Sequence, residues 1–127
     1  MTDGFCDVSI GGYDGDVASV WNVKTVKART PHVCDECGET IVPTQQYERA
    51  SGLFDGEWST WRICLPCCEV SAEFTESGGR VYGGAMWNEL VDQWEQGAHL
   101  QACLNRLTTA AAKAMMRRRW MKWKRLT

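Results

Sequence analysis

Long apolar runs are missing from this sequence of 127 residues. No stretch approaches the roughly 18 apolar residues that a membrane-spanning helix needs. The first 12 residues are acidic and interrupted by glycine, so they do not show the basic and then apolar pattern of a secretory signal. These absences argue against an exported protein or a membrane protein, and we expect a cytoplasmic location.

Acidic residues are missing from the carboxyl end, because no aspartate or glutamate follows Glu95. All 16 acidic residues therefore lie in residues 1–95, whereas eight of the 14 basic residues lie in residues 96–127. By formal charge the first part carries about −10 and the second about +8. The basic end can fold back onto the acidic body, or it can face an external polyanion. The sequence leaves both possibilities open.

Histidine is scarce, with only His32 and His99 in the chain. HNH-type nucleases use histidines to bind a catalytic divalent ion, and this sequence does not contain their motif. His99 precedes Cys103 at a helical spacing, but the sequence indicates no orienting group or oxyanion donor near them. Three glutamates on one side of a predicted helix fit a solvated face better than acid–base chemistry: Glu69, Glu73 and Glu76. We therefore predict that the protein is not an enzyme and has no small-molecule substrate.

Cysteine, in contrast, is plentiful, with seven in the chain. Four of them form two Cys-x-x-Cys pairs: Cys34, Cys37, Cys64 and Cys67. Two such pairs at this spacing are typical of a tetrahedral zinc site. Four protein ligands leave no open position for water, so we expect one structural Zn²⁺ and not a catalytic one. Seven thiols cannot all pair within one chain, and a reducing compartment would keep them available for metal.

Two other residues can join this site. Cys68 can replace its neighbour Cys67 as a ligand, and His32 can act as a ligand or as a hydrogen-bond donor to one. The sequence does not decide between these options. Cys6 and Cys103 lie far from the four cysteines, and we expect them to pack as small hydrophobic side chains.

The residues around the two pairs predict an α+β fold centred on zinc. Gly38 permits a positive φ after the first pair, as a zinc-knuckle turn requires. Residues 46–51 and 57–63 flank an Asp-Gly turn, which predicts a β-hairpin between the pairs. Pro66 suits the start of a helix, which we predict through the second pair to residue 75. A knuckle, a hairpin and a helix in this order form a treble clef.

The flanking segments predict a further strand and two helices. Residues 17–28 are rich in β-branched side chains and predict one strand or two short ones. A short amphipathic helix is predicted from the spacing of Trp87, Leu90, Val91 and Trp94. Residues 98–126 contain no glycine or proline, which predicts one helix of roughly 40 Å whose basic end projects from the body. We divide a single domain, 1–127, into an amino-terminal β element, a zinc-binding core, an amphipathic helix and a basic helix: 1–31, 32–78, 85–97 and 98–127.

The basic end interleaves cations with tryptophans: Lys113, Arg117, Arg118, Arg119, Trp120, Lys122, Trp123, Lys124 and Arg125. Cations neutralise phosphates, and indoles stack on unpaired bases. The composition therefore predicts binding to nucleic acid or a nucleoprotein, with single strands or RNA ahead of sequence-specific duplex recognition. The alternatives are that these residues bind an acidic partner or dock on residues 1–95.

The central segment also resembles a known kind of protein. Its Cys-Asp-Glu-Cys-Gly-Glu-Thr-Ile run at 34–41, Tyr47, Trp58, Arg62 and its Cys-Leu-Pro-Cys run at 64–67 resemble small zinc-ribbon or treble-clef proteins of bacteriophages and prophages. The resemblance implies metal ligation by the four cysteines and nothing about catalysis. A phage protein of this kind is expected in the host cytoplasm. There it could inhibit a host defence or transcription complex by placing its acidic body on a basic site.

Overall fold

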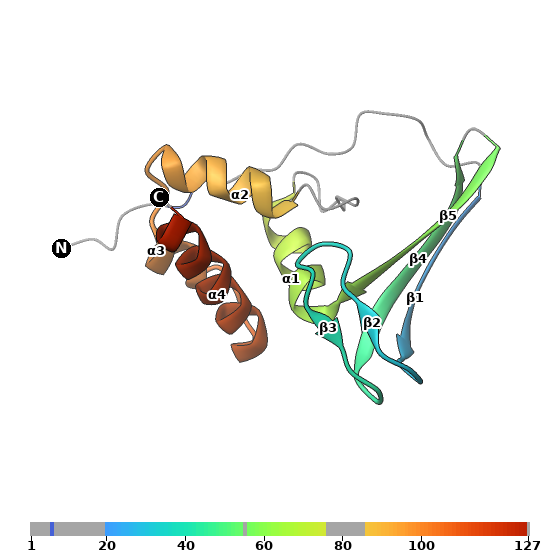
Figure 1. Ribbon diagram of the computed structural model, residues 1–127. Coiled ribbons are helices and arrows are strands. Elements are labelled where there is room, and N and C mark those ends of the chain that lie inside the picture. The colour runs from blue at the N-terminus through green and yellow to red at the C-terminus, as the bar shows by residue number, and fades with distance from the viewer. Residues whose placement is uncertain (1–5, 7–19, 55, 76–85, 127) are drawn as a thin grey trace.

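The computed structural model describes residue 6 and residues 20–54, 56–75 and 86–126 (Figure 1). Strands and helices are both present, which confirms the predicted mixture of α and β structure. The extended strands lie at one end of the molecule and the helices gather at the other (Figure 1). Among these residues, no helix is both long enough and apolar enough to cross a membrane.

Three antiparallel strands form the larger sheet in the order β1-β4-β5. They are β1 (Val20–Lys27), β4 (Gln46–Phe54) and β5 (Glu57–Cys64). The strand predicted in residues 17–28 and the hairpin predicted between the cysteine pairs are both confirmed. Gly56, in the hairpin turn, has a φ of 80°, a conformation that glycine adopts without steric cost. The hairpin register brings Cys64, the last residue of β5, opposite Tyr47 at the start of β4.

A second, two-stranded sheet carries the first cysteine pair. It consists of β2 (His32–Val33) and β3 (Thr40–Ile41), which pair in antiparallel fashion. Between them the chain makes a tight turn in which Gly38 has a φ of 77°. The positive φ predicted for this glycine is therefore confirmed. We call residues 34–39 the knuckle loop.

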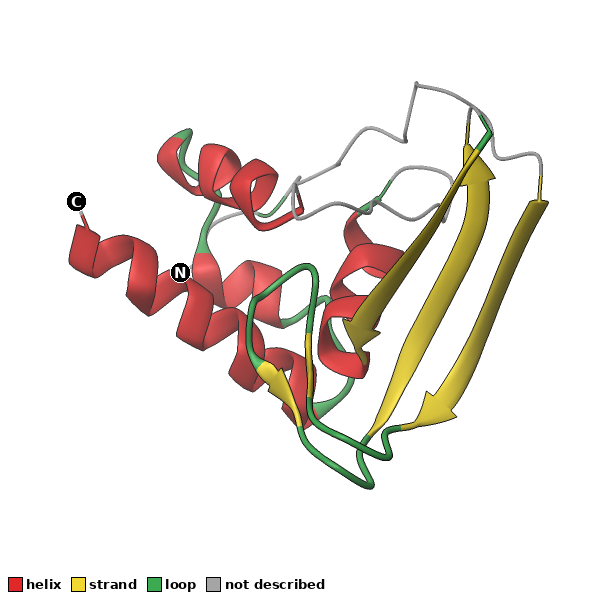
Figure 2. Cartoon of the chain, turned by 45° about the vertical axis from the view of Figure 1, so that its right-hand side comes forward, coloured by secondary structure: helices red, strands yellow, loops and turns green. Residues whose placement is uncertain are grey.

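Two helices follow the hairpin. Helix α1 (Leu65–Phe74) begins directly after β5, with Pro66 in its first turn as predicted. Helix α2 (Met86–Glu95) buries one face, which includes the predicted residues Trp87, Leu90 and Trp94. The helical core that α2 shares with its neighbours contains large and fully buried side chains: Phe74, Met86, Trp87, Leu90, Met115 and Met116. Figure 2 shows these helices packed together beside the sheet.

The prediction of one continuous helix over residues 98–126 is wrong. The chain instead forms α3 (Leu100–Leu104), a turn, and α4 (Ala110–Leu126). Thr109 marks the break, because its hydroxyl oxygen accepts a hydrogen bond from the Ala112 amide at 3.1 Å. Threonine in this position caps the start of a helix and does not continue the preceding one. The turn allows α4 to pack back against α1.

Glu69 on α1 holds this turn in place, so the prediction that it belongs to a solvated face is wrong. Its carboxylate accepts hydrogen bonds from the Thr108 amide at 2.7 Å and from the Thr109 hydroxyl at 2.6 Å. Desolvation opposes the charged form of Glu69, but the hydrogen bonds from Thr109 and Thr108 outweigh it and lower its pKa. Glu73 is exposed, as expected of a solvated face, and pairs there with Arg106 at 3.1 Å. Glu76 lies outside the described residues.

A disulfide joins Cys6 to Cys103 on α3, across a sequence separation of 97. The expectation that these two cysteines pack as free thiols is therefore wrong. Arg106, which follows α3, makes a second contact with Cys6 by donating a hydrogen bond to its carbonyl oxygen at 2.8 Å. Sequence spacing carries no information about such a pair, because the intervening fold alone brings the two residues together.

Candidate metal centre

The structure brings together the four cysteines of the two Cys-x-x-Cys pairs, as the sequence predicts. Their sulfur atoms all lie within 4.8 Å of one another, and all four side chains are buried. The knuckle loop supplies Cys34 and Cys37, the end of β5 supplies Cys64, and the first turn of α1 supplies Cys67. Four sulfur atoms converging from separate elements form a candidate metal site.

Backbone hydrogen bonds shape the knuckle loop around its sulfur atoms. The Gly38 amide donates to the Cys34 carbonyl oxygen at 2.9 Å, and the Glu39 amide donates to the Cys37 sulfur at 3.4 Å. The Cys64 amide donates to the Cys34 sulfur at 3.3 Å and so links the two halves of the site. Amides that point at sulfur stabilise thiolates, which are the form that binds metal.

A second set of hydrogen bonds fixes the knuckle loop against the hairpin. The Asp35 amide donates to the Arg62 carbonyl oxygen at 2.8 Å, and the Arg62 amide donates to the Asp35 carboxylate at 2.7 Å. The two cysteine pairs are therefore held close by their backbones as well as by any metal between them.

Trp87 adds a contact that the sequence did not reveal. Its indole N–H donates to the Cys67 sulfur at 3.4 Å, from a ring that is only 1% exposed. The spacing of apolar residues in α2 predicts that Trp87 is buried, but periodicity does not show what its N–H meets. Groups that hydrogen-bond to a ligand atom orient it and tune its affinity for metal. Trp87 thus connects α2 to the candidate metal centre.

The four thiols strongly influence one another's protonation. The pKa of Cys34 is lowered, chiefly because Cys37 and then Cys64 donate hydrogen bonds to its sulfur. The pKa of Cys67 is raised, chiefly because its proton is shared with Cys34 and then Cys37. Four neighbouring thiols cannot all ionise without a cation to offset their charge. A divalent cation would therefore displace protons from the site when it binds.

The donor set limits which metals fit. Four thiolates suit soft or borderline ions that accept tetrahedral sulfur coordination, such as zinc or iron.

Cys68 and His32, the two other ligands that the sequence offers, lie outside the group of four cysteines. The Cys68 sulfur faces the Ile63 carbonyl oxygen at 3.7 Å, and the His32 ring packs on Tyr47 with 5.4 Å between centroids.

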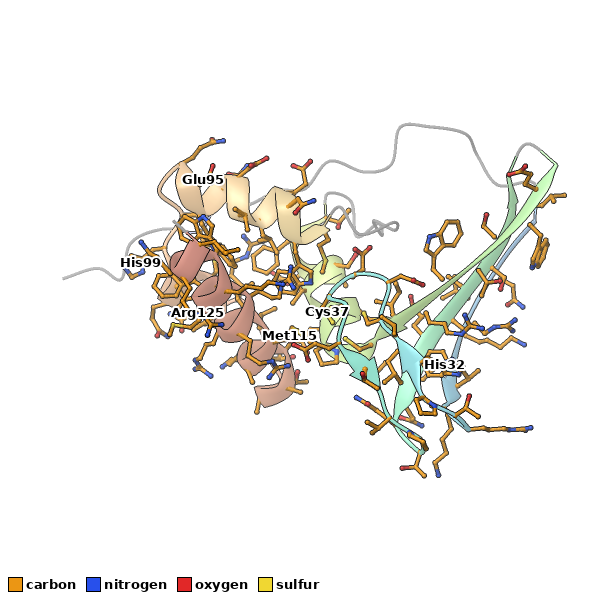
Figure 3. The ribbon with its side chains drawn as sticks, viewed as in Figure 1. His32, Cys37, Glu95, His99, Met115 and Arg125 are labelled. Atoms are coloured by element: carbon orange, nitrogen blue, oxygen red, sulfur yellow. A yellow bond between two sulfur atoms is a disulfide. The ribbon has the colours of Figure 1, made fainter. Side chains whose placement is uncertain are left out.

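The basic helix does not project from the body, contrary to the prediction. Arg118 on α4 pairs with Glu39 of the knuckle loop at 3.0 Å. Arg119 donates to the Cys37 carbonyl oxygen at 3.2 Å and lies 5.5 Å from the centroid of the Trp87 ring. In Figure 3, Cys37 and Met115 lie where the knuckle loop meets α4. The metal centre and the basic helix are thus in direct contact.

A groove of about 540 Å³ runs along this contact, between the knuckle loop and α4. We call it the basic groove. Five of the cations singled out from the sequence line it: Arg117, Arg118, Arg119, Lys122 and Arg125. Among the described residues, Glu39 is the one acidic residue in its lining. Trp120, Trp123 and Lys124 line a second hollow, and Lys113 lines neither of the two.

Comparison with protein-family models, curated proteins and solved structures found no match. The candidate site is therefore interpreted from its own residues.

Proposed function

We propose that the four cysteines hold one structural Zn²⁺ in a treble-clef arrangement, and that the protein is a non-catalytic module that binds nucleic acid or a nucleoprotein. The basic groove contacts the phosphates. In this proposal the protein acts in the cytoplasm of a cell; the four site cysteines are free thiols, although the Cys6–Cys103 pair is oxidised in the structure.

The observation that carries the proposal is the concentration of charge in the basic groove. Five cations and a single carboxylate line it. Four of the cations are exposed in the structure, and three of these form no ion pair or hydrogen bond with the knuckle loop, all of which the structure describes: Arg117, Lys122 and Arg125. A polyanion that follows the groove would meet several cations at once and release the counterions it had condensed, which is the main source of affinity for phosphate backbones.

Arg118 and Arg119 are engaged in contacts with the knuckle loop that a phosphate can replace or share. The ion pair of Arg118 with Glu39 has side chains 51% and 44% exposed. Exposed pairs of this kind contribute only about 0–1 kcal/mol. A phosphate oxygen can therefore compete with Glu39 for Arg118 at little cost.

Zinc supports this function by shaping the groove. When bound, Zn²⁺ would fix four thiolates in a closed tetrahedron and stabilise the fold without offering a position for substrate. The knuckle loop would then present the Cys37 carbonyl oxygen to Arg119 and the Glu39 carboxylate to Arg118. These contacts position the basic face of α4.

Salt-dependent binding to a single-stranded oligonucleotide of random sequence tests the proposal. We expect the logarithm of the binding constant to fall linearly with the logarithm of salt concentration, measured by fluorescence anisotropy. Replacing Arg117, Lys122 and Arg125 with glutamine should reduce that slope by about 2, since each phosphate contact to a single strand contributes about 0.7.

A matched control replaces three exposed cations on and beside β1 with glutamine: Lys24, Lys27 and Arg29. This variant loses the same formal charge away from the groove and should keep the slope of the parent protein. If the salt dependence of the binding constant decreased equally in both variants, net charge and not the groove would govern binding. No binding at low salt would refute the proposal and favour an inhibitor that acts through its acidic body.

A further inference from the structure

The second hollow lies on the opposite side of α4 from the basic groove. It measures about 390 Å³ and lies between the α2–α3 junction and the last turns of α4. We call it the tryptophan hollow. Its main lining residues are Trp94, His99, Leu100, Trp120, Trp123 and Lys124. Figure 3 shows His99, Glu95 and Arg125 at this end of the helical part, away from the sheet. Its volume falls within the roughly 300–1,000 Å³ of small-ligand sites.

Three indole rings and one cation form the wall of the hollow. The Trp123 centroid lies 5.8 Å from that of Trp94 and 6.2 Å from that of Trp120. The Lys124 ammonium lies 5.0 Å from the Trp123 centroid and 5.5 Å from that of Trp120. Trp120 and Trp123 are only half-buried, so part of this aromatic surface remains accessible. Aromatic faces beside a cation are the features that bind nucleobases in single strands.

Two of these three rings, those of Trp94 and Trp123, carry indole N–H groups that lack an acceptor among the described residues. The indole nitrogens of Trp94 and Trp123 are covered from solvent, and neither has a hydrogen-bond partner within the described part of the chain. Trp94 as a whole is only 4% exposed. Buried indole N–H groups usually find a partner. Both nitrogens are covered in this arrangement, so an acceptor on a ligand would reach them only if the rings reorient.

The helical geometry of α4 relates the tryptophan hollow to the basic groove. With about 3.6 residues per turn, residues two apart point in directions that differ by roughly 200°. Arg118 in the groove and Trp120 in the hollow are two residues apart, and so are Met121 and Trp123. Groove and hollow therefore lie on either side of an exposed ridge of α4, formed by the groove residues Arg117 and Met121. One strand can cross this ridge and reach both.

We infer that the tryptophan hollow binds an unpaired base of a single-stranded nucleic acid whose phosphates lie in the basic groove. This inference rests on the proposed function and narrows its partner to single strands. A planar base stacks on the accessible indole surface of Trp120 and Trp123. Bases in a duplex are stacked and paired, so they cannot enter the hollow without leaving the helix.

The test compares two single strands of equal length, oligothymidine and an abasic strand with the same phosphates. Oligothymidine should bind more tightly and quench tryptophan fluorescence, whereas the abasic strand should bind through charge alone and leave the fluorescence unchanged. Because the quenching is measured on the unaltered protein, it does not depend on any variant folding correctly.

Two variants test whether the tighter binding of oligothymidine depends on the tryptophan hollow. Trp120→Leu should weaken oligothymidine binding about 5- to 150-fold, the range found when a stacking aromatic is removed, and leave binding of the abasic strand unchanged. Trp58→Leu is the matched control, because Trp58 is an exposed tryptophan on β5 that is far from the hollow in sequence and fold. It should alter neither affinity.

The outcomes separate the inference from the proposed function. If oligothymidine and the abasic strand bind equally and without quenching, the tryptophan hollow is not a base site, although the basic groove stands. If a duplex of the same length quenches as strongly as oligothymidine, the inference is overturned in the same way. If neither strand binds at low salt, the proposed function fails and the inference fails with it.

Discussion

Replacing Trp87 with phenylalanine should weaken metal binding although Trp87 is not a ligand. The substitution keeps an aromatic ring in the core and removes the indole N–H that donates to the Cys67 sulfur at 3.4 Å. Because the ring is 1% exposed, water cannot easily take the place of that donor. The Cys67 thiolate would then bear its charge with one hydrogen bond fewer, and its orientation toward the metal would be less restricted.

The size of the effect follows from the kind of bond that is lost. Hydrogen bonds to charged groups contribute about 1.5–3 kcal/mol, and a sulfur acceptor belongs near the lower end of that range. A loss of about 1.5 kcal/mol corresponds to roughly a tenfold weaker metal affinity. This agrees with the about 10- to 100-fold losses that follow removal of groups supporting metal ligands in other sites.

Competition with a chromophoric chelator measures the affinity directly. Trp94→Phe is the matched control, because Trp94 lies on the same helix and is also buried, and its indole nitrogen has no acceptor among the described residues. Both substitutions remove the same atoms from the core and should lower the free energy of unfolding to similar extents. Only Trp87→Phe should lower the metal affinity. Equal affinities for the two variants would refute a role for the N–H···S contact.

Three further predictions concern the disulfide, the α1–α4 junction and the thiols. Cys6→Ser should lower the free energy of unfolding by roughly 2–4 kcal/mol in denaturant titrations without reductant, because the disulfide closes a very long loop; an equal loss with reductant would contradict this. The pKa of Glu69 is lower in the folded protein than in the unfolded chain. Ionised Glu69 therefore stabilises the fold at pH values above its pKa in the unfolded chain, and this stabilisation is lost as the pH falls through its pKa in the folded protein. Glu69→Gln should therefore flatten the acid side of the stability profile, and an unchanged profile would argue against it. Metal affinity should fall as the pH is lowered, since thiols must lose protons to bind; chelator competition at two pH values checks this, and equal affinities would exclude thiolate ligands.

The local parts of the fold could be predicted because they depend on neighbouring residues. Gly38 indicates the knuckle turn by its freedom to adopt a positive φ, and the Asp-Gly step before Trp58 indicates the hairpin. Spacing alone predicts the four cysteines of the candidate metal centre, because each Cys-x-x-Cys pair places two sulfur atoms on one turn.

Sequence and structure differ where a distant segment decides the structure. The absence of glycine and proline from residues 98–126 predicts a helix through Thr109, yet the carboxylate of Glu69 binds the turn there and favours a new helix start. The pairing of Cys6 with Cys103 depends in the same way on residues that are far apart in the sequence. Neither the Glu69–Thr109 contact nor the disulfide produces a periodic pattern in the sequence around its residues.

The opposed charges of the two halves of the chain illustrate how one fact can support two interpretations. The sequence left open whether the basic end folds back on the body or faces an external polyanion. The structure shows Arg118 and Arg119 in contact with the knuckle loop, while Arg117, Lys122 and Arg125 on the same helix remain exposed. The two interpretations are therefore compatible, because cations of one groove make both kinds of contact: Arg118 and Arg119 bond to the knuckle loop, and Arg117, Lys122 and Arg125 face solvent. The contacts of Arg118 and Arg119 anchor α4 to the candidate metal centre and so hold the other three cations in place along the groove.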